Sequence, residues 1–406
     1  MKRILYCGDA AVQTGFGRVA EYLIPALAKE YEVHVMATNW GGDPHPMQQV
    51  CQMYPAMVYG NDPFGSHRIG ELINRIKPDL VWVTNDFWIA ISLWGQIAKI
   101  KEVIPFKFFC YTPIDSYGIY PQTMPPVQDW DGIATYTEFG AIELQKAGYE
   151  KHIDVVGHGT DFTKFFPTDQ RESRKQLGVP EDAFIIFNGN RNQPRKRIDL
   201  TIKGFVEFAL DKPDARLWLH MGQKDLGWDI VPLFKRVARD MGYDSTGKLI
   251  LTSPAFSTDN CLSIEELNLV YNAADIGVNT CIGEGWGLVN TEHAATGVAQ
   301  LVPDHTSLKE IFNDIPRIPI ESWEVDRNYG LDRAQPSPSG MALLLNEYYQ
   351  DRERLKEIGE WCYNRIHEEQ FTWPYVGKQM QDIVKRLLKE PVKTEFKGFG
   401  IPTKIN

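Results

Sequence analysis

The sequence predicts an α/β protein with two domains, each built on a parallel β-sheet. Its 406 residues exceed what one core usually holds, since domains typically contain about 100 to 200 residues. Short apolar runs alternate with amphipathic helical segments, which is the pattern of βαβ units and parallel sheets. A loop-like and then charged segment at residues 160–179 interrupts this alternation once. We therefore expect two separate series of strands.

The first series lies in the N-terminal part, in a domain expected over residues 1–165. Its apolar runs are separated by helical segments such as residues 18–30, where Val19, Leu23 and Leu27 recur at helical spacing. The expected strands are residues 3–7, 33–37, 80–84, 106–111, 133–136 and 153–156.

The second series defines a domain expected over residues 166–370. Helices are expected at residues 198–210 and 263–274, and the Pro/Ser/Gly-rich stretch 334–340 is expected to be a loop. Residues 341–369 then read as helix with two amphipathic halves. The expected strands are residues 184–188, 216–220, 249–252, 276–279 and 299–302.

Composition limits the class of protein. Six cysteines occur without a C-x-x-C pair, which argues against a zinc knuckle or a disulfide framework and favours a reducing cytoplasm. No run approaches the ~18 apolar residues that a membrane span needs, and the first residues read as a strand rather than as a signal peptide. The formal charge of −10 argues against a polyanionic partner.

A glycine-rich turn follows the expected strand 276–279 and precedes an expected helix at 289–297. Free backbone N–H groups at such a turn favour a bound anion, and a diphosphate or a sugar hydroxyl would suit it. Glu284 in the turn and Glu292 in the helix are acceptors for ribose or hexose hydroxyls.

These residues resemble a known family. Glu284-Gly285-Trp286-Gly287-Leu288, with Glu292 eight positions after Glu284, is similar to the E-G-F/W-G-L motif and second glutamate of the retaining GT-B glycosyltransferases of family 4. Arg191 and Lys196, five positions apart, match that family's phosphate-binding loop. Further blocks resemble it in the same order along the chain, at residues 15–17, 159–167 and 371–373.

The resemblance implies a GT-B fold, in which two Rossmann-like domains face each other across a donor cleft and a C-terminal helix and tail at 371–406 cross back to the N-terminal domain. It implies catalytic roles for Arg191, Lys196 and Glu284, with the two cations neutralising the departing diphosphate. A nucleotide-diphosphate sugar would be the co-substrate, with no other cofactor. The implied donor-binding residues are Gly15, Gly17, His158, Gly285, Trp286, Gly287, Leu288 and Glu292.

Some positions depart from the family or have a simpler interpretation. Asp115 follows a strand where many relatives carry a histidine near the transferred sugar, and we expect it on the acceptor side. Arg195 and Arg197 are interpreted as solvated charges, and His293 as a packing residue. The D-x-D letters at Asp129 and Asp131 precede a strand instead of ending one, so we expect a structural role and no metal.

The sequence thus predicts a metal-independent, cytoplasmic glycosyltransferase that moves a sugar with retention of configuration to a hydroxyl acceptor. A saccharide or small glycoside is favoured, because residues 1–150 contain 11 Lys and Arg against 16 Asp and Glu. Three alternatives stay open: transfer to hydroxylated bases in nucleic acid, a sugar-nucleotide epimerase or phosphorylase, and a catalytically silent binding protein.

Overall fold

The computed structural model describes residues 1–252 and 262–392, which fall into two compact units. Unit 1 contains residues 1–114 and 118–159 and the chain from Trp373 onward; unit 2 contains residues 115–117 and 160–372. Cys261 and the last part of the expected tail, residues 393–406, lie outside the described residues. The chain therefore leaves unit 1 after Gly159 and returns to it at Trp373.

Unit 1 is built on a seven-stranded parallel sheet in the order β3-β2-β1-β4-β5-β6-β7. The strand order reverses beside β1, as in doubly wound Rossmann-like sheets. The sequence predicted every strand of this sheet except β3. The strands are β1 (Arg3–Gly8), β2 (Glu32–Ala37), β3 (Gln52–Pro55), β4 (Leu80–Thr84), β5 (Lys107–Thr112), β6 (Gly132–Thr135) and β7 (Asp154–Val155).

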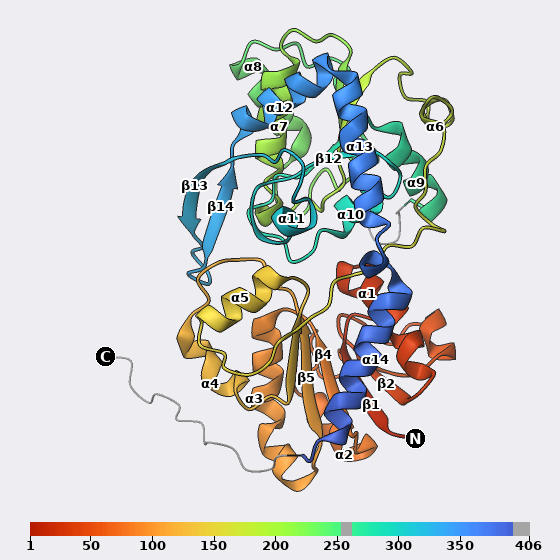
Figure 1. Ribbon diagram of the computed structural model, residues 1–406, viewed down its shortest axis with the longest axis vertical. Helices are drawn as coiled ribbons and strands as arrows, with labels where there is room; N and C mark the ends of the chain where they lie inside the picture. The colour runs from red at the N-terminus through yellow and green to blue at the C-terminus, as the bar shows by residue number, and fades with distance from the viewer. Residues whose placement is uncertain (253–261, 393–406) are drawn as a thin grey trace. The chain divides into compact units, whose positions relative to one another are not determined.

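Helices cover both faces of this sheet (Figure 1). On one face, Leu5 and Cys7 join a core that α2, α3, α4 and α5 supply. On the other face α14 packs beside α1, where the rings of Tyr22 and Trp373 stack with centroids 4.4 Å apart. The helices are α1 (Gly15–Ala28), α2 (Ile69–Ile76), α3 (Phe87–Val103), α4 (Met124–Val127), α5 (Glu138–Lys146) and α14 (Trp373–Lys389).

Unit 2 contains a five-stranded parallel sheet in the order β10-β9-β8-β11-β12, so the predicted fold class of two Rossmann-like parallel sheets is confirmed. All five strands were predicted: β8 (Phe184–Asn188), β9 (Ala215–Leu219), β10 (Leu249–Leu251), β11 (Ile276–Val278) and β12 (Ala299–Leu301). The helices are α6 (Gln170–Leu177), α7 (Ile198–Ala209), α8 (Ile230–Asp240), α9 (Ile264–Ala273), α10 (Leu288–Ala294), α11 (Thr306–Ile311), α12 (Pro338–Gln350) and α13 (Arg352–Ile366).

Unit 2 also contains an antiparallel hairpin of β13 (Ile320–Val325) and β14 (Asp332–Pro336), which the sequence did not predict. The expected loop at 334–340 is wrong. Pro336 ends β14, and the Ser337 side chain accepts from Gly340 N to cap α12, which has Pro338 in its first turn. Proline is tolerated at the end of a strand and in the first turn of a helix, because neither position needs the backbone N–H that proline lacks.

No helix within residues 1–252 and 262–392 is long and apolar enough to cross a membrane.

Candidate functional site

The glycine-rich turn between β11 and α10 is held from behind by backbone and side-chain hydrogen bonds. Glu284 N donates to Thr306 Oγ1 at 3.2 Å, and Ser307 Oγ donates to Glu284 O at 2.8 Å. Gly287 has a φ of +100°, and a Cβ there would lie 2.6 Å from a methyl carbon of Leu308, so glycine is needed for both reasons. The turn is therefore a fixed platform at the carboxyl edge of the second sheet.

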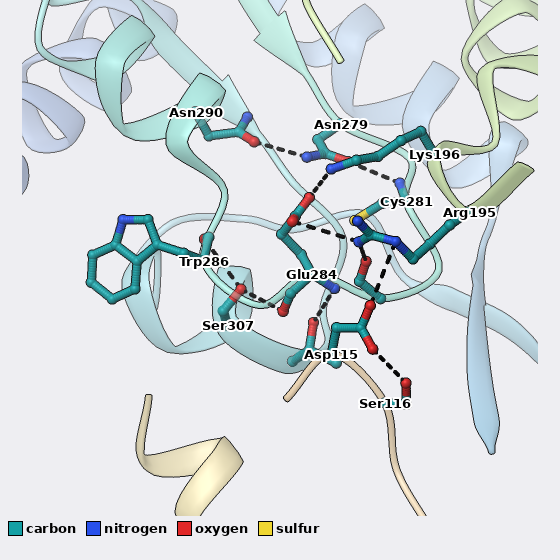
Figure 2. A network of polar contacts seen from close by, with 12 residues as sticks. Asp115, Ser116, Arg195, Lys196, Asn279, Cys281, Glu284, Trp286, Asn290 and Ser307 are labelled. Atoms are coloured by element: carbon teal, nitrogen blue, oxygen red, sulfur yellow. Dashed lines mark hydrogen bonds and ion pairs between the residues drawn. The ribbon is translucent and has the colours of Figure 1, made fainter. Parts of the chain in front are cut away.

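Lys196 and Glu284 meet on this platform (Figure 2). Lys196 ends a 3-10 turn, Pro194–Lys196, that follows β8, and its Nζ donates to Glu284 Oε2 in an ion pair. Each side chain is only 10% exposed. Burial alone would raise the pKa of the Glu284 carboxyl, but the adjacent Lys196 and Arg195 cations hold it below its ordinary value. Glu284 is therefore an anion at neutral pH.

Arg195 lies in the same network, so its interpretation as a solvated charge is wrong. Its Nη1 donates to Gly283 O and lies 3.6 Å from Glu284 Oε1, and its Nε lies 3.5 Å from Asp115 Oδ2. The side chain is 30% exposed. Arg195 thus bridges two carboxylates that are far apart in the sequence.

Asp115 lies in the short segment 115–117, which groups with unit 2 although the chain before and after that segment belongs to unit 1. Besides Arg195 it contacts Arg333 of β14, whose Nη1 donates to Asp115 Oδ1 at 3.0 Å, and Ser116, whose hydroxyl donates to the same oxygen at 2.7 Å. Burial alone would raise the pKa of Asp115, but Arg195 and Arg333 hold it below its ordinary value.

Two cations of the network share one carboxylate. Lys196 Nζ pairs with Glu284 Oε2, and Arg195 Nη1 lies 3.6 Å from Glu284 Oε1. Over the wider network the charges balance, because Arg333 Nε also lies 3.9 Å from Asp326 Oδ2. The two cations beside Glu284 can attract an anionic ligand, and low local dielectric strengthens that attraction.

Arg191, which was predicted to be catalytic beside Lys196, pairs elsewhere in this structure. Its guanidinium donates to both carboxylate oxygens of Asp225, at 2.7 and 3.1 Å, and its side chain is 61% exposed. Exposed pairs contribute about 0 to 1 kcal/mol, so this pair is easily exchanged for a stronger anion.

The remaining predicted residues of the turn and of α10 are buried or nearly so. Glu292 accepts from the Tyr271 hydroxyl at 3.5 Å, and Trp286 packs against Phe371 with ring centroids 5.8 Å apart. His293 donates from Nε2 to Tyr271 O at 3.0 Å and stacks on the Tyr271 ring, which agrees with the predicted packing role.

Three predicted donor-binding residues, Gly15, Gly17 and His158, belong to unit 1. Gly15 starts α1, and a Cβ on Gly17 would lie 2.1 Å from Val12 O, so Gly17 is required by the loop that precedes the helix. The His158 ring is buried, with Nδ1 2.9 Å from the Tyr111 hydroxyl, and burial lowers its pKa to about 3. His158 is therefore neutral.

Asp131, the second carboxylate of the D-x-D letters, has the predicted structural role. Asp131 lies 2.5 Å from Lys101 Nζ and 3.2 Å from Lys107 Nζ, and it accepts from Phe108 N at 2.8 Å. Both lysine side chains are almost fully buried. Within the described ranges, no group of three or more His, Cys, Asp or Glu side chains has the arrangement of a metal site.

Sequence reasoning missed several residues of the network, among them Arg195, Arg333, Thr306 and Ser307. The basic run around Lys196 was a signal for Arg195, but its partners Gly283 and Glu284 lie 88 and 89 positions away. Arg333 lies 218 positions from Asp115, and no local pattern marks that pairing.

Curated relatives are glycosyltransferases, although no family model matches the sequence. The D-inositol 3-phosphate glycosyltransferase of Corynebacterium kroppenstedtii is 27% identical over 245 residues, which is 59% of this chain and 49% of the relative. A GDP-mannose-dependent monoacylated alpha-(1-6)-phosphatidylinositol monomannoside mannosyltransferase of Corynebacterium glutamicum is 26% identical over 66% of this chain and 74% of its own length. The alignment spans about half the length of the first of these relatives.

Solved structures share the fold over nearly the whole chain. Sucrose-phosphate synthase from Thermosynechococcus elongatus matches with a TM-score of 0.71 and 14% identity, over 96% of this chain and all of that one. The Anabaena protein HepE in complex with UDP and glucose matches with a TM-score of 0.70 and 12% identity, over 95% and 100%. The predicted resemblance is therefore confirmed: the chain is similar in sequence to glycosyltransferases and has the GT-B fold of two Rossmann-like domains.

Proposed function

We propose that this protein is a retaining glycosyltransferase that moves a sugar from a nucleotide-diphosphate donor to a hydroxyl acceptor. The observation that carries this proposal is the convergence of Lys196 and Arg195 on Glu284 in the glycine-rich turn after β11. It combines a cationic cluster suited to a diphosphate with an ionised acceptor suited to sugar hydroxyls.

The chemistry needs the cations when the bond between the sugar C1 and the diphosphate oxygen breaks. The electron pair stays on the diphosphate, and preorganised cations stabilise that new charge. The acceptor oxygen then bonds to C1 on the face from which the diphosphate departs, and its proton passes to a donor phosphate oxygen. Lys196 and Arg195 contact the diphosphate in this proposal, and Arg191 exchanges Asp225 for it.

The binding roles follow from the same arrangement. Glu284 and the backbone of Gly285 to Gly287 hold the transferred sugar, with Trp286 and Leu288 shaping the turn, and Glu292 accepts from the ribose hydroxyls. Gly15, Gly17 and His158 keep their proposed roles as donor-binding residues, and Asp115 keeps that of an acceptor-side residue.

The proposed acceptor is a saccharide or small glycoside, and the reaction takes place in the cytoplasm without a metal ion. Two relatives named for glycosyl transfer to inositol phosphates or their lipids support a hydroxylated ring as acceptor. The acidic balance of residues 1–150 supports an uncharged one.

The test begins with a panel of nucleotide sugars read by thermal shift. A ligand at 100 times its dissociation constant adds about 2.7 kcal/mol to stability, which moves the melting temperature measurably. Candidate acceptors are then supplied with the stabilising donor in excess chelator, and the anomeric configuration of the product is assigned by NMR. An inverted product, an epimerised or phosphorolysed donor without acceptor, or stabilisation without turnover each contradicts the proposal.

Lys203 supplies the matched control for this assay. It is an exposed lysine on α7, close in sequence to the phosphate-binding loop. Lys203→Ala should turn over like the wild type, whereas Lys196→Ala should not.

A further inference from the structure

A buried arginine connects the β13–β14 hairpin to the candidate site. Arg333 has a side chain that is 7% exposed, and its Nη1 donates to both the carboxylate and the backbone carbonyl of Asp115, at 3.0 and 3.1 Å. Asp115 in turn lies 3.5 Å from Arg195. A continuous chain of contacts therefore runs from β14 to the arginine that touches Glu284.

The backbone strengthens this connection. Tyr117 N donates to Asp332 O at 3.3 Å, and Asp332 N donates to Tyr117 O at 3.0 Å, so Tyr117 forms an isolated antiparallel bridge with the first residue of β14. This pairing fixes the position of the segment that carries Asp115.

The glycine-rich turn also fits against the same segment. An added Cβ at Gly283 would lie 2.1 Å from Asp115 O and 2.6 Å from Arg333 Nη1. Only glycine allows the turn to approach Asp115 this closely, and the Gly283 carbonyl is the one that accepts from Arg195.

A second residue of β14 acts on the same loop. Gln335, two positions after Arg333 and so on the same side of the strand, accepts from Arg197, the residue after Lys196. Arg333 thus holds Arg195 through Asp115, and Gln335 holds Arg197 directly. These two arginines are the sequence neighbours of Lys196.

We infer that the hairpin is a buttress for the site, in which Arg333 is a positioning residue that fixes Asp115 and thereby holds Arg195 against Glu284. The consequence for diphosphate binding rests on the proposed function, whereas the effect on Arg195 does not. Without Arg333, Asp115 loses its two-point contact and Arg195 loses a fixed partner.

The test compares Arg333→Met and Arg333→Lys with Arg327→Met, a matched control in the exposed turn of the same hairpin. The first readout is the NMR chemical shift of the Arg195 Nε–H group. Its signal is identified as the one that is missing in Arg195→Lys. We expect Arg333→Met to shift this signal toward that of a free arginine, Arg333→Lys to shift it partly, and Arg327→Met to leave it in place.

The second readout is the dissociation constant of UDP and of GDP. We expect Arg333→Met to weaken whichever of the two binds the wild type by about tenfold, the loss of one modest charge-assisted contact. The double variant with Arg333→Met and Asp115→Asn should have the same dissociation constant as Asp115→Asn alone, because both changes remove the same support of Arg195. A purely structural role would lower the melting temperature and give additive effects.

The outcomes distinguish a failure of the buttress role from a failure of the proposed function. An unchanged Arg195 signal in folded Arg333→Met, or additive effects in the double variant, overturns the buttress. A shifted Arg195 signal in a protein that binds neither UDP nor GDP leaves the buttress standing and counts against the proposed function. Gly283→Ala gives an independent check, since its Cβ should displace Asp115 and reproduce the Arg195 shift of Arg333→Met.

Discussion

Lys196 and Glu284, 88 positions apart in the sequence, form an ion pair in which each side chain is only 10% exposed. A buried pair contributes little net stability against an apolar equivalent, because desolvating both charges is costly. Its presence here points to a role in binding or chemistry, and the predictions follow from what each partner of the network would lose.

Lys196→Ala should lower turnover by about 10²- to 10³-fold, because a preorganised charge that stabilises the leaving group is lost. It should also destabilise the fold, since Glu284 keeps only Arg195 as a cationic partner. Steady-state kinetics and thermal melts measure the two effects. Turnover close to that of Lys203→Ala would remove Lys196 from the chemistry.

Arg191→Ala should lower turnover by a similar factor but leave the melting temperature unchanged. Its pair with Asp225 is exposed and contributes about 0 to 1 kcal/mol. Asp225→Asn is the informative companion, because it releases Arg191 without removing it and should preserve or improve diphosphate affinity. If Arg191→Ala and Asp225→Asn lower turnover equally, turnover requires the intact Arg191–Asp225 ion pair and not an Arg191 released to bind the diphosphate.

Glu292→Ala should weaken donor binding by about 1.5 to 3 kcal/mol, the value of hydrogen bonds to a charged acceptor. Calorimetric titration with the donor measures this. Tyr271→Phe is the control, since it removes the hydroxyl 3.5 Å from Glu292 and leaves the carboxylate in place. If Tyr271→Phe weakens the donor as much as Glu292→Ala does, the carboxylate has only a packing role.

Stability should fall as the pH drops below 6.5. Burial lowers the pKa of His158 and His293 to about 3 and that of His220 and His305 to about 4. Below about pH 6.5 these histidines are therefore protonated in the unfolded chain but still neutral in the folded protein. The free energy of unfolding is thus highest above pH 6.5 and decreases as the pH falls toward 4. Each histidine contributes about 1.4 kcal/mol per pH unit in that window.

Denaturant titrations at pH 7, 6 and 5 test this dependence. His293→Gln should reduce the slope by about one proton. A stability that is flat from pH 7 to 5 would contradict neutral burial of these four rings.

Sugar transfer should be nearly independent of salt between 50 and 200 mM. A neutral saccharide releases no condensed counterions, whereas a polynucleotide that neutralises six phosphates would lose about 10³-fold in affinity over that range. Rates with saccharide and with hydroxylated DNA acceptors, measured at both salt concentrations, decide between them. Transfer only to DNA, with that salt dependence, would replace the saccharide proposal.

Much of the fold was predictable because parallel strands are short runs of buried apolar residues, as in β4 and β8. Strand β3, with the sequence QMYP, lacks such a run, and it was missed. The hairpin was missed because prolines 336 and 338 are typical of loops, although here they end one element and begin the next.

Only the parts of the site that lie in recognisable sequence motifs were predictable. The pattern of Glu284 and the basic run around Lys196 pointed to the correct loops, yet not to which cation of the run meets the carboxylate. Arg195 was assigned to solvent because sequence neighbours do not reveal partners in loops that are distant along the chain. Asp115 and Arg333 are joined only by tertiary packing, across 218 positions.

The return of the chain to unit 1 at Trp373 has a consequence for biosynthesis. Helix α14 supplies part of the packing around α1, including the ring that stacks on Tyr22. A ribosome has therefore synthesised all of unit 2 before it makes the helix that completes unit 1. During that interval the apolar surface of unit 1 that α14 covers is exposed, so the domain begun first is the last to be finished.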